Sequence, residues 1–397
     1  MLKDYNVNEI LLGLTLFSLP ISTALNSVFL VLFFLYNLFY RIKHRSFKDM
    51  IYYSPAYIIF FIHLIGYFVS EYREDAAKKA VLFLSFFFLP FLFQPIGKII
   101  KIEKMILYLF YGILLITIYA FGRSVYDILI LDVRYDYGRG VDLLLNYTPH
   151  HTYLSMYILS VILGISYLIG EKKVTYHLSI SLPFLYLMIF LLPSRTAIIL
   201  ALTIVPFFIF NFLKNRFDKT KMVTVLLLSF ALLVILGFSI DYTRDKMVYA
   251  FYEVFNISTK EKPFYGISRR RIVWNTCLNL IEKAPFLGYG IGDVQHILDT
   301  TYIANEHFEL KKINAHNQYL QNILNYGVFF STIFAGIIIW VLAKLVKRKE
   351  SLLISIWIVI ITISFTESIL QRQWGVVFFS IILIMSLYRI NLNKIHY

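Results

Sequence analysis

The feature that most constrains this chain is a succession of apolar segments that occupies most of its 397 residues. A helix needs about 20 apolar residues to cross the hydrocarbon core of a bilayer. We expect spans at 8–23, 25–40, 52–70, 79–95, 104–126, 151–170, 176–193, 195–213, 222–240, 316–343, 351–369 and 374–389. The sequence therefore predicts an all-α, polytopic membrane protein with about 12 transmembrane helices.

Composition and charge agree with this class. Hydrophobic residues make up 59% of the chain and charged residues 16%, whereas soluble domains carry about a quarter charged residues. Six short connectors together hold 19 Lys and Arg and five acidic residues: 41–50, 97–104, 171–177, 214–221, 344–350 and 389–397. Their net charge of +14 equals that of the whole chain. Short basic loops mark the cytoplasmic side, which predicts cytoplasmic termini. The charge is thus a topology signal, and no nucleic-acid partner is expected.

The span assignment divides the chain into three parts. Residues 1–240 hold helices 1 to 9, residues 241–315 form one large loop on the outer face, and residues 316–397 hold helices 10 to 12 and a cytoplasmic tail. The first span is expected to act as an uncleaved anchor. A single cysteine, Cys277, excludes a disulfide within the chain and a Cys-based metal cluster.

Polar residues gather where the large loop meets the tenth span. His316-Asn317 is followed by Gly327, and Asn314, Gln318, Gln321 and Asn325 follow helical spacing on one stripe. A polar stripe that enters lipid must face protein or water, which favours a lined cavity and marks a candidate functional site. The alternative to a functional role is that His316 is a structural histidine buried in the core.

Two groups of arginines are candidate anion sites. Arg195 lies between two apolar runs, where it either snorkels to the interface or binds a ligand, and we favour the second. Arg269, Arg270 and Arg271 stand together in the large loop, where a solvated or lipid-contacting face is the alternative. Because guanidinium groups bind phosphate through paired hydrogen bonds, Arg195 with this group suggests a diphosphate clamp.

Other polar positions have weaker signals. His150 and His151 precede the sixth span without metal-ligand spacing, so lining a polar cavity is favoured over a catalytic role. Glu367 is either a catalytic carboxylate or the ion-pair partner of Arg372. The glycine-rich run 285–292 follows no strand, so a turn between loop helices is expected rather than a phosphate loop.

Several of these runs together resemble the O-antigen ligase and polymerase superfamily of membrane glycosyltransferases. The signature is His316-Asn317, nine residues, then Gly327, and the chain departs from it at Phe330, which we expect to affect packing. The further matching runs are Ser194-Arg195-Thr196-Ala197, Ser268-x-Arg270-x3-Trp274, Pro285-Phe286-Leu287-Gly288-Tyr289-Gly290-Ile291-Gly292 and Thr366-Glu367-Ser368-x-Leu370.

The resemblance implies a C-type glycosyltransferase fold that acts on the periplasmic face of a bacterial inner membrane. The donor would be a glycan on undecaprenyl diphosphate. A ligase moves it to lipid A–core, a polymerase moves it to another lipid-linked repeat, and a related branch glycosylates proteins; we favour the ligase. In the family, two arginines contact the diphosphate and the signature histidine is essential, roles that match Arg195, Arg270 and His316. Arg271, Asn317, His150 and His151 are further candidate substrate contacts, with Glu367 as a second catalytic candidate. No metal or cofactor is expected.

A transporter or flippase for the same lipid-linked sugar is the alternative of a different class. It predicts charged residues near the bilayer midplane and repeat-related broken helices. Polar residues of this chain gather at the outer mouth and no repeat is evident, which favours an enzyme.

Overall fold

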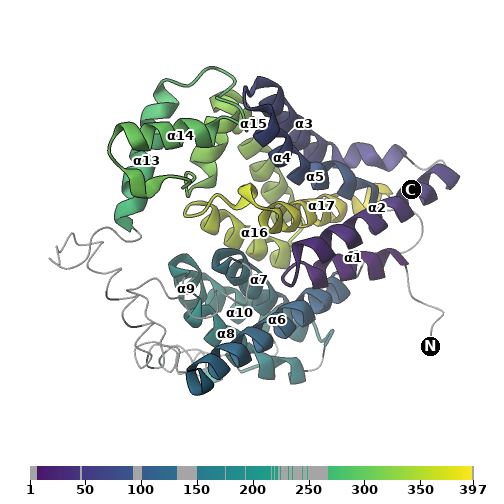
Figure 1. Ribbon diagram of the computed structural model, residues 1–397. Coiled ribbons are helices and arrows are strands. Elements are labelled where there is room, and N and C mark those ends of the chain that lie inside the picture. The colour runs from purple at the N-terminus through teal and green to yellow at the C-terminus, as the bar shows by residue number, and fades with distance from the viewer. Residues whose placement is uncertain are drawn as a thin grey trace. The chain divides into compact units, whose positions relative to one another are not determined.

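The computed structural model describes most of the chain, and every regular element within the described residues is helical (Figure 1). The described residues are 7–44, 47–92, 101–131, 150–174, 176–192, 194–215, 217–218, 220–221, single positions up to 248, and 267–395. The expected span 222–240 and the first part of the large loop therefore lie outside the continuously described residues.

The chain divides into two compact units. Unit 1 comprises residues 1–30 and 100–259, and unit 2 comprises residues 31–99 and 260–397. The described part of the large loop thus falls in the same unit as the last three apolar segments. The three-part division expected from the sequence stays a prediction.

Unit 1 is arranged around one helix that is apolar on all sides. This helix, α7 (His151–Gly170), is buried over nearly its whole length, as expected for a helix without a polar face. It packs against α6 (Ile102–Ile130), α8 (Ser181–Leu191), α9 (Arg195–Leu202) and α10 (Ile204–Leu213), while α1 (Val7–Ser18) packs against α6.

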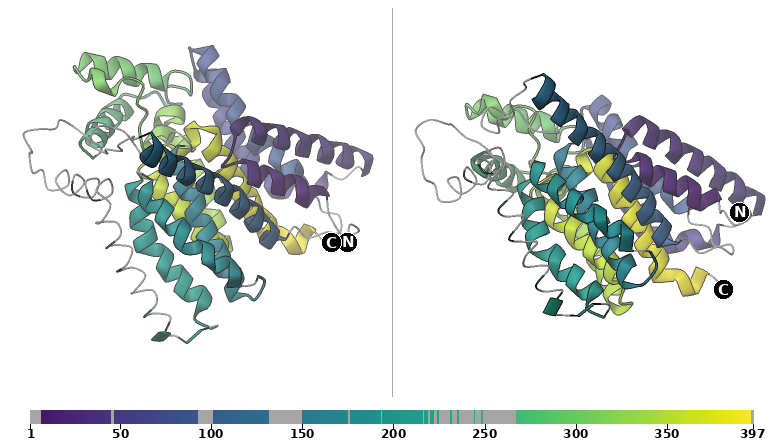
Figure 2. Two further views of the ribbon diagram at one scale, coloured as in Figure 1. Left: turned by 60° about the horizontal axis from the view of Figure 1, so that its bottom comes forward. Right: turned by 90° about the horizontal axis from the view of Figure 1, so that it is seen from below.

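Unit 2 combines helices from both ends of the chain, which can be followed by colour in Figure 2. Its earlier elements are most of α2 (Thr23–His44), η1 (Lys48–Tyr53), α3 (Ser54–Val69), α4 (Arg73–Leu82), α5 (Leu84–Phe88) and η2 (Leu89–Leu92). Its later elements are α13 (Ile267–Glu282), α14 (Val294–Ala304), η5 (Phe308–Leu310), α15 (Gln318–Lys347), α16 (Ser351–Ser364), η6 (Ile369–Gln371) and α17 (Gln373–Ile395). The apolar α17 is central, because it contacts α3, α5, α15 and α16.

Several of these helices have the dimensions of membrane spans. Seven in the described part of the chain are long and apolar enough to cross a bilayer, and three shorter apolar helices accompany them. Large apolar side chains such as Val31, Leu35 and Phe39 of α2 are exposed, as lipid-facing residues would be. The chain is therefore a multi-pass membrane protein.

The expected number of about 12 spans and the C-type glycosyltransferase fold stay predictions. The segment 79–95, expected as one span, is interrupted: α4 ends at Leu82, and α5 and η2 follow as short pieces. Pro90 lies in η2, where its missing N–H does not support a continuing α-helix, whereas the break at Phe83 has no such residue beside it.

Candidate functional site

The signature residues form a tight turn that begins α15. The side-chain oxygen of Asn314 accepts a hydrogen bond from the backbone N–H of His316 at 3.0 Å. His316 has a φ of +43°, a left-handed conformation that non-glycine residues seldom adopt and that is concentrated at functional sites. Asn317 then caps the helix, because its side-chain oxygen accepts from the N–H groups of Tyr319 and Leu320.

This turn holds His316 against a buried carboxylate. Nδ1 of His316 lies 3.2 Å from Oε2 of Glu367, in the loop between α16 and η6. Two further bonds tie the same loop to the turn: Asn317 N–H donates to Oγ of Ser368, and Leu370 N–H donates to Oε1 of Gln318. The side chain of Glu367 is 8% exposed, whereas that of His316 is about one-third exposed at 32%. The imidazole thus faces the carboxylate on one side and remains accessible.

The pair has a definite chemical capacity. A carboxylate only accepts hydrogen bonds, so a neutral His316 donates Nδ1–H to Glu367 and keeps its lone pair on Nε2. An imidazole oriented this way by a carboxylate is a general base for a hydroxyl group. Sequence analysis singled out both residues, and the structure brings them together.

The polar stripe on the first half of α15 is buried, which confirms that it faces protein rather than acyl chains. Gln318 donates to Asn322 at 2.7 Å and Gln321 donates to Asn325 at 3.2 Å. Oε1 of Gln321 also accepts the backbone N–H of Ala315, next to His316. These amides therefore fix the position of the signature turn on the helix.

Gly327 is the point where α15 kinks. Its φ of 73° and ψ of 171° lie in a region that is essentially restricted to glycine. The kink leaves the carbonyls of Leu324 and Asn325 to accept the backbone N–H groups of Tyr289 and Gly290 at 2.8 and 3.2 Å. A Cβ on Gly327 would overlap the carbonyl oxygen of Phe286. Glycine in the signature thus allows the chain around residues 286–290 to approach the helix closely.

Residues 285–292, here called the Gly-rich turn, connect α13 to α14, as expected from the sequence. The other side of the turn is fastened to the end of α3 and the residue after it: Ile291 N–H donates to Gly66 O, and Gly292 N–H donates to Oγ of Ser70. The adjacent Asp293 accepts the N–H groups of Glu71 and Tyr72 at 2.8 and 2.9 Å. The turn is therefore a structural joint rather than a phosphate loop.

The arginines of α13 differ in placement. Arg270 lies one turn before Val273 and two turns before Cys277, so it shares their helix face. That face packs into a cluster that includes Ala315, the neighbour of His316, and Leu324. Figure 1 shows α13 beside the beginning of α15. Arg270 is half-buried and Arg271 is exposed, which makes Arg270 the better candidate for an ordered anion contact.

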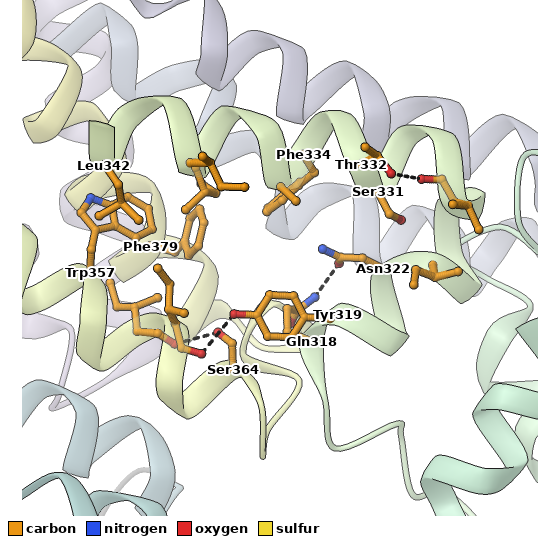
Figure 3. Close-up of a pocket in the computed structure, with 17 residues that line it drawn as sticks. Gln318, Tyr319, Asn322, Ser331, Thr332, Phe334, Leu342, Trp357, Ser364 and Phe379 are labelled. Atoms are coloured by element: carbon orange, nitrogen blue, oxygen red, sulfur yellow. Dashed lines mark hydrogen bonds between the residues drawn. The ribbon is translucent and has the colours of Figure 1, made fainter. Parts of the chain in front are cut away.

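A groove lies between α15, α16 and α17 within unit 2 (Figure 3). Its volume is about 370 Å³. One part of the lining is polar and follows His316 directly in sequence, and the remainder is mainly apolar. The labelled polar residues are Gln318, Tyr319, Asn322, Ser331, Thr332 and Ser364, and the labelled apolar ones are Phe334, Leu342, Trp357 and Phe379. An amphipathic chain could lie here with its polar end near His316.

Of the remaining predicted site residues, three belong to unit 1, and Asn317 caps α15. Arg195 is the first residue of α9 and is half-buried. The rings of His150 and His151 stack at the beginning of α7, with their centroids 4.2 Å apart. A diphosphate clamp that includes Arg195, and substrate contacts of these histidines, stay predictions. The same holds for Asn317, whose oxygen is engaged in capping.

Some contacts in and near the candidate site were not expected from the sequence. Ser368 and Asn314 support the turn, and Oη of Tyr326 lies 2.6 Å from Nδ1 of the buried His63 in α3. The only sequence signal for Tyr326 is its place directly before the signature glycine. Among the described residues, no group of three His, Cys, Asp or Glu gathers as a metal site, and metal independence stays a prediction.

Residues 180–335 match the family model described as O-antigen ligase. This match confirms the resemblance to the O-antigen ligase and polymerase superfamily. The matched segment covers less than half of the chain, but it includes Arg195, Arg270, His316 and Gly327. Comparison with curated proteins gives no significant match.

Proposed function

We propose that this protein is an O-antigen ligase-type glycosyltransferase that moves a glycan from undecaprenyl diphosphate to a lipid A–core acceptor at the periplasmic face of the inner membrane. The observation that carries the proposal is the pair formed by His316 and the buried Glu367, 3.2 Å apart, at the beginning of the helix that carries the family signature.

In the proposed reaction, the acceptor hydroxyl oxygen attacks the anomeric carbon of the glycan. The bond from that carbon to the diphosphate oxygen breaks, and undecaprenyl diphosphate leaves with the electron pair. Nε2 of His316 takes the hydroxyl proton, while Glu367 holds the ring and stabilises its protonated form. Glu367 is therefore a positioning residue that acts through His316.

The leaving diphosphate requires positive charge. Arg270 lies on the α13 face that packs toward Ala315, and it would supply one forked donor. Arg195 would supply the second, on the family resemblance. Two guanidinium groups stabilise a diphosphate leaving group without a metal ion.

The groove supports a lipid-linked substrate. Its polar lining at Gln318 and Asn322 is continuous with the signature turn, and its apolar lining extends to Leu342. A hydrocarbon chain in the groove would place the attached polar group at the end near His316. This arrangement fits a substrate that carries both a glycan and a lipid.

The test uses detergent-purified protein with a lipid-linked glycan donor and, in parallel, lipid A–core or a second lipid-linked glycan as acceptor. We expect transfer to lipid A–core, and a loss of about 10²–10⁴-fold in kcat for His316→Ala. Glu367→Gln should lower kcat less, with donor affinity unchanged, since the amide oxygen can still accept from Nδ1–H.

The outcomes distinguish the alternatives. Transfer only to a second lipid-linked glycan identifies a polymerase, and activity that requires sealed vesicles identifies a transporter. A His316→Ala variant that transfers glycan within about threefold of wild type removes His316 from the mechanism, because a general base contributes far more than that.

A further inference from the structure

The Gly-rich turn carries an apolar tip that the catalytic proposal does not use. Phe286 is 72% exposed and Leu287 is 36% exposed. Large apolar side chains that are exposed together and continue an apolar patch indicate an interaction surface. The tip is therefore a candidate for such a surface.

The tip is held rigidly. Gly288 N–H donates to the carbonyl of Pro285 at 2.8 Å, closing the turn directly behind Phe286 and Leu287. The next two residues, Tyr289 and Gly290, donate to carbonyls of α15. Because its backbone is fixed on the kink of α15, the tip presents its side chains at one defined level along that helix.

That level is the boundary between the polar and apolar parts of α15. The buried amides Gln318 to Asn325 precede Gly327, whereas Val328, Phe329 and Phe330 follow it directly. Val328 and Phe329 are 61% and 51% exposed, and the ring of Phe286 stacks on that of Phe329 with centroids 5.8 Å apart. The tip thus extends the exposed apolar surface at the first turn beyond the kink.

The same surface continues along α15. Phe329 and Trp340 are separated by three helical turns, and both are exposed. Val328 and Ile339 have the same spacing and are also exposed, at the edge of the groove that they line. In a helix long and apolar enough to span a bilayer, an exposed apolar face of this length faces acyl chains. A tip that stacks on the end of that face lies at the same acyl chains.

We propose that Phe286 and Leu287 insert into the lipid leaflet at the Gly327 end of α15 and anchor the Gly-rich turn to the membrane. The partner is the hydrocarbon of the bilayer itself. Since the turn also holds the kink, this anchor fixes the depth of the signature turn relative to the lipid headgroups. The proposal does not depend on which glycan is transferred.

The test is spin-label accessibility in liposomes of phosphatidylethanolamine and phosphatidylglycerol. Nitroxide labels are placed singly by Phe286→Cys, Leu287→Cys, Phe329→Cys and Asn305→Cys. Wild type serves as the blank, because its only cysteine, Cys277, is completely buried. Phe329 is the reference for lipid, and Asn305, exposed at the end of α14, is the reference for water.

We expect the ratio of collision rates with oxygen to those with a water-soluble nickel reagent to be high at 286 and 287, as at 329, and low at 305. Ratios at both 286 and 287 equal to that at 305 would overturn the proposal, since the tip would then lie in water. Protection from both reagents would also overturn it, because the tip would then be covered by protein. Two label positions keep the test valid if one variant fails to fold.

Discussion

Replacing Gly327 by alanine tests whether the kink of α15 is required for the fold and for the site. The residue has φ 73° and ψ 171°, and an added Cβ would overlap the carbonyl oxygen of Phe286. The obstacle is backbone, which cannot rotate away as a side chain can. Alanine therefore forces both a different conformation at residue 327 and a separation of the Gly-rich turn from the helix.

The two effects can be assigned magnitudes. A non-glycine residue in this backbone region costs about 1–3 kcal/mol. Separation of the turn breaks the hydrogen bonds from Tyr289 N–H to Leu324 O and from Gly290 N–H to Asn325 O, at about 0.5–1.5 kcal/mol each. The free energy of unfolding should fall by about 2–6 kcal/mol, which corresponds to a fall in Tm of roughly 2–7 °C, given about 2.1 cal/mol/K of unfolding entropy per residue.

The assay is thermal unfolding in detergent with a thiol dye that fluoresces on reaction. Cys277 is the only cysteine, and it is buried in the cluster that contains Leu324, so the dye reports directly on the packing of α13 against α15. Gly336→Ala in the same helix is the matched control, because a Cβ there meets nothing within 4 Å. It should be neutral or stabilise by about 0.5–1 kcal/mol. A Gly327→Ala variant with the Tm and activity of wild type would refute the reasoning.

Three further predictions concern the arginines, the thiol and metal ions. Arg270→Lys should weaken donor binding, at a cost of about 1.5–3 kcal/mol for a charged hydrogen bond, whereas exposed Arg271→Lys should change it little; equal effects in a donor-binding assay would contradict the difference in placement. Burial raises the pKa of the Cys277 thiol to about 12, so a maleimide at pH 8 should label it only after unfolding, and rapid labelling of native protein followed by mass spectrometry would show that the cluster opens. Glycan transfer should survive EDTA, and activity lost in EDTA and restored by Mg²⁺ would show that arginines alone do not stabilise the leaving group.

The helices could be predicted where apolar runs have clear ends. The expected span 151–170 coincides with α7, and 195–213 coincides with α9 and α10 together. Hydrophobic length alone could not show that 79–95 is interrupted, since its composition is apolar on average and the break arises locally. Charge patterning predicted orientation, which remains a prediction because it concerns the membrane rather than the fold.

The site could be predicted as a set of residues but not as contacts. His316 and Glu367 were both singled out, yet the sequence offered Arg372 as the partner of Glu367, and the structure places His316 at 3.2 Å. Fifty-one residues separate the pair, and a pattern within one segment carries no information about such a distant contact. Likewise, the sequence did not show that the side-chain oxygen of Asn317 caps α15, and a contact of Asn317 with the substrate stays a prediction.

The two ends of the signature perform different physical tasks that one rigid element couples. Residues 318–326 form about 14 Å of helix between the signature turn and the kink. At one end, the loop 366–370 holds His316; at the other, the Gly-rich turn holds the helix and is itself fastened to residues 66–72. Because the buried amides of this short helix bond to each other and to Ala315, we expect a displacement at Gly327 to shift the turn that presents the imidazole. We therefore expect Gly327, eleven residues from His316, to be as necessary for glycan transfer as the proposed base itself.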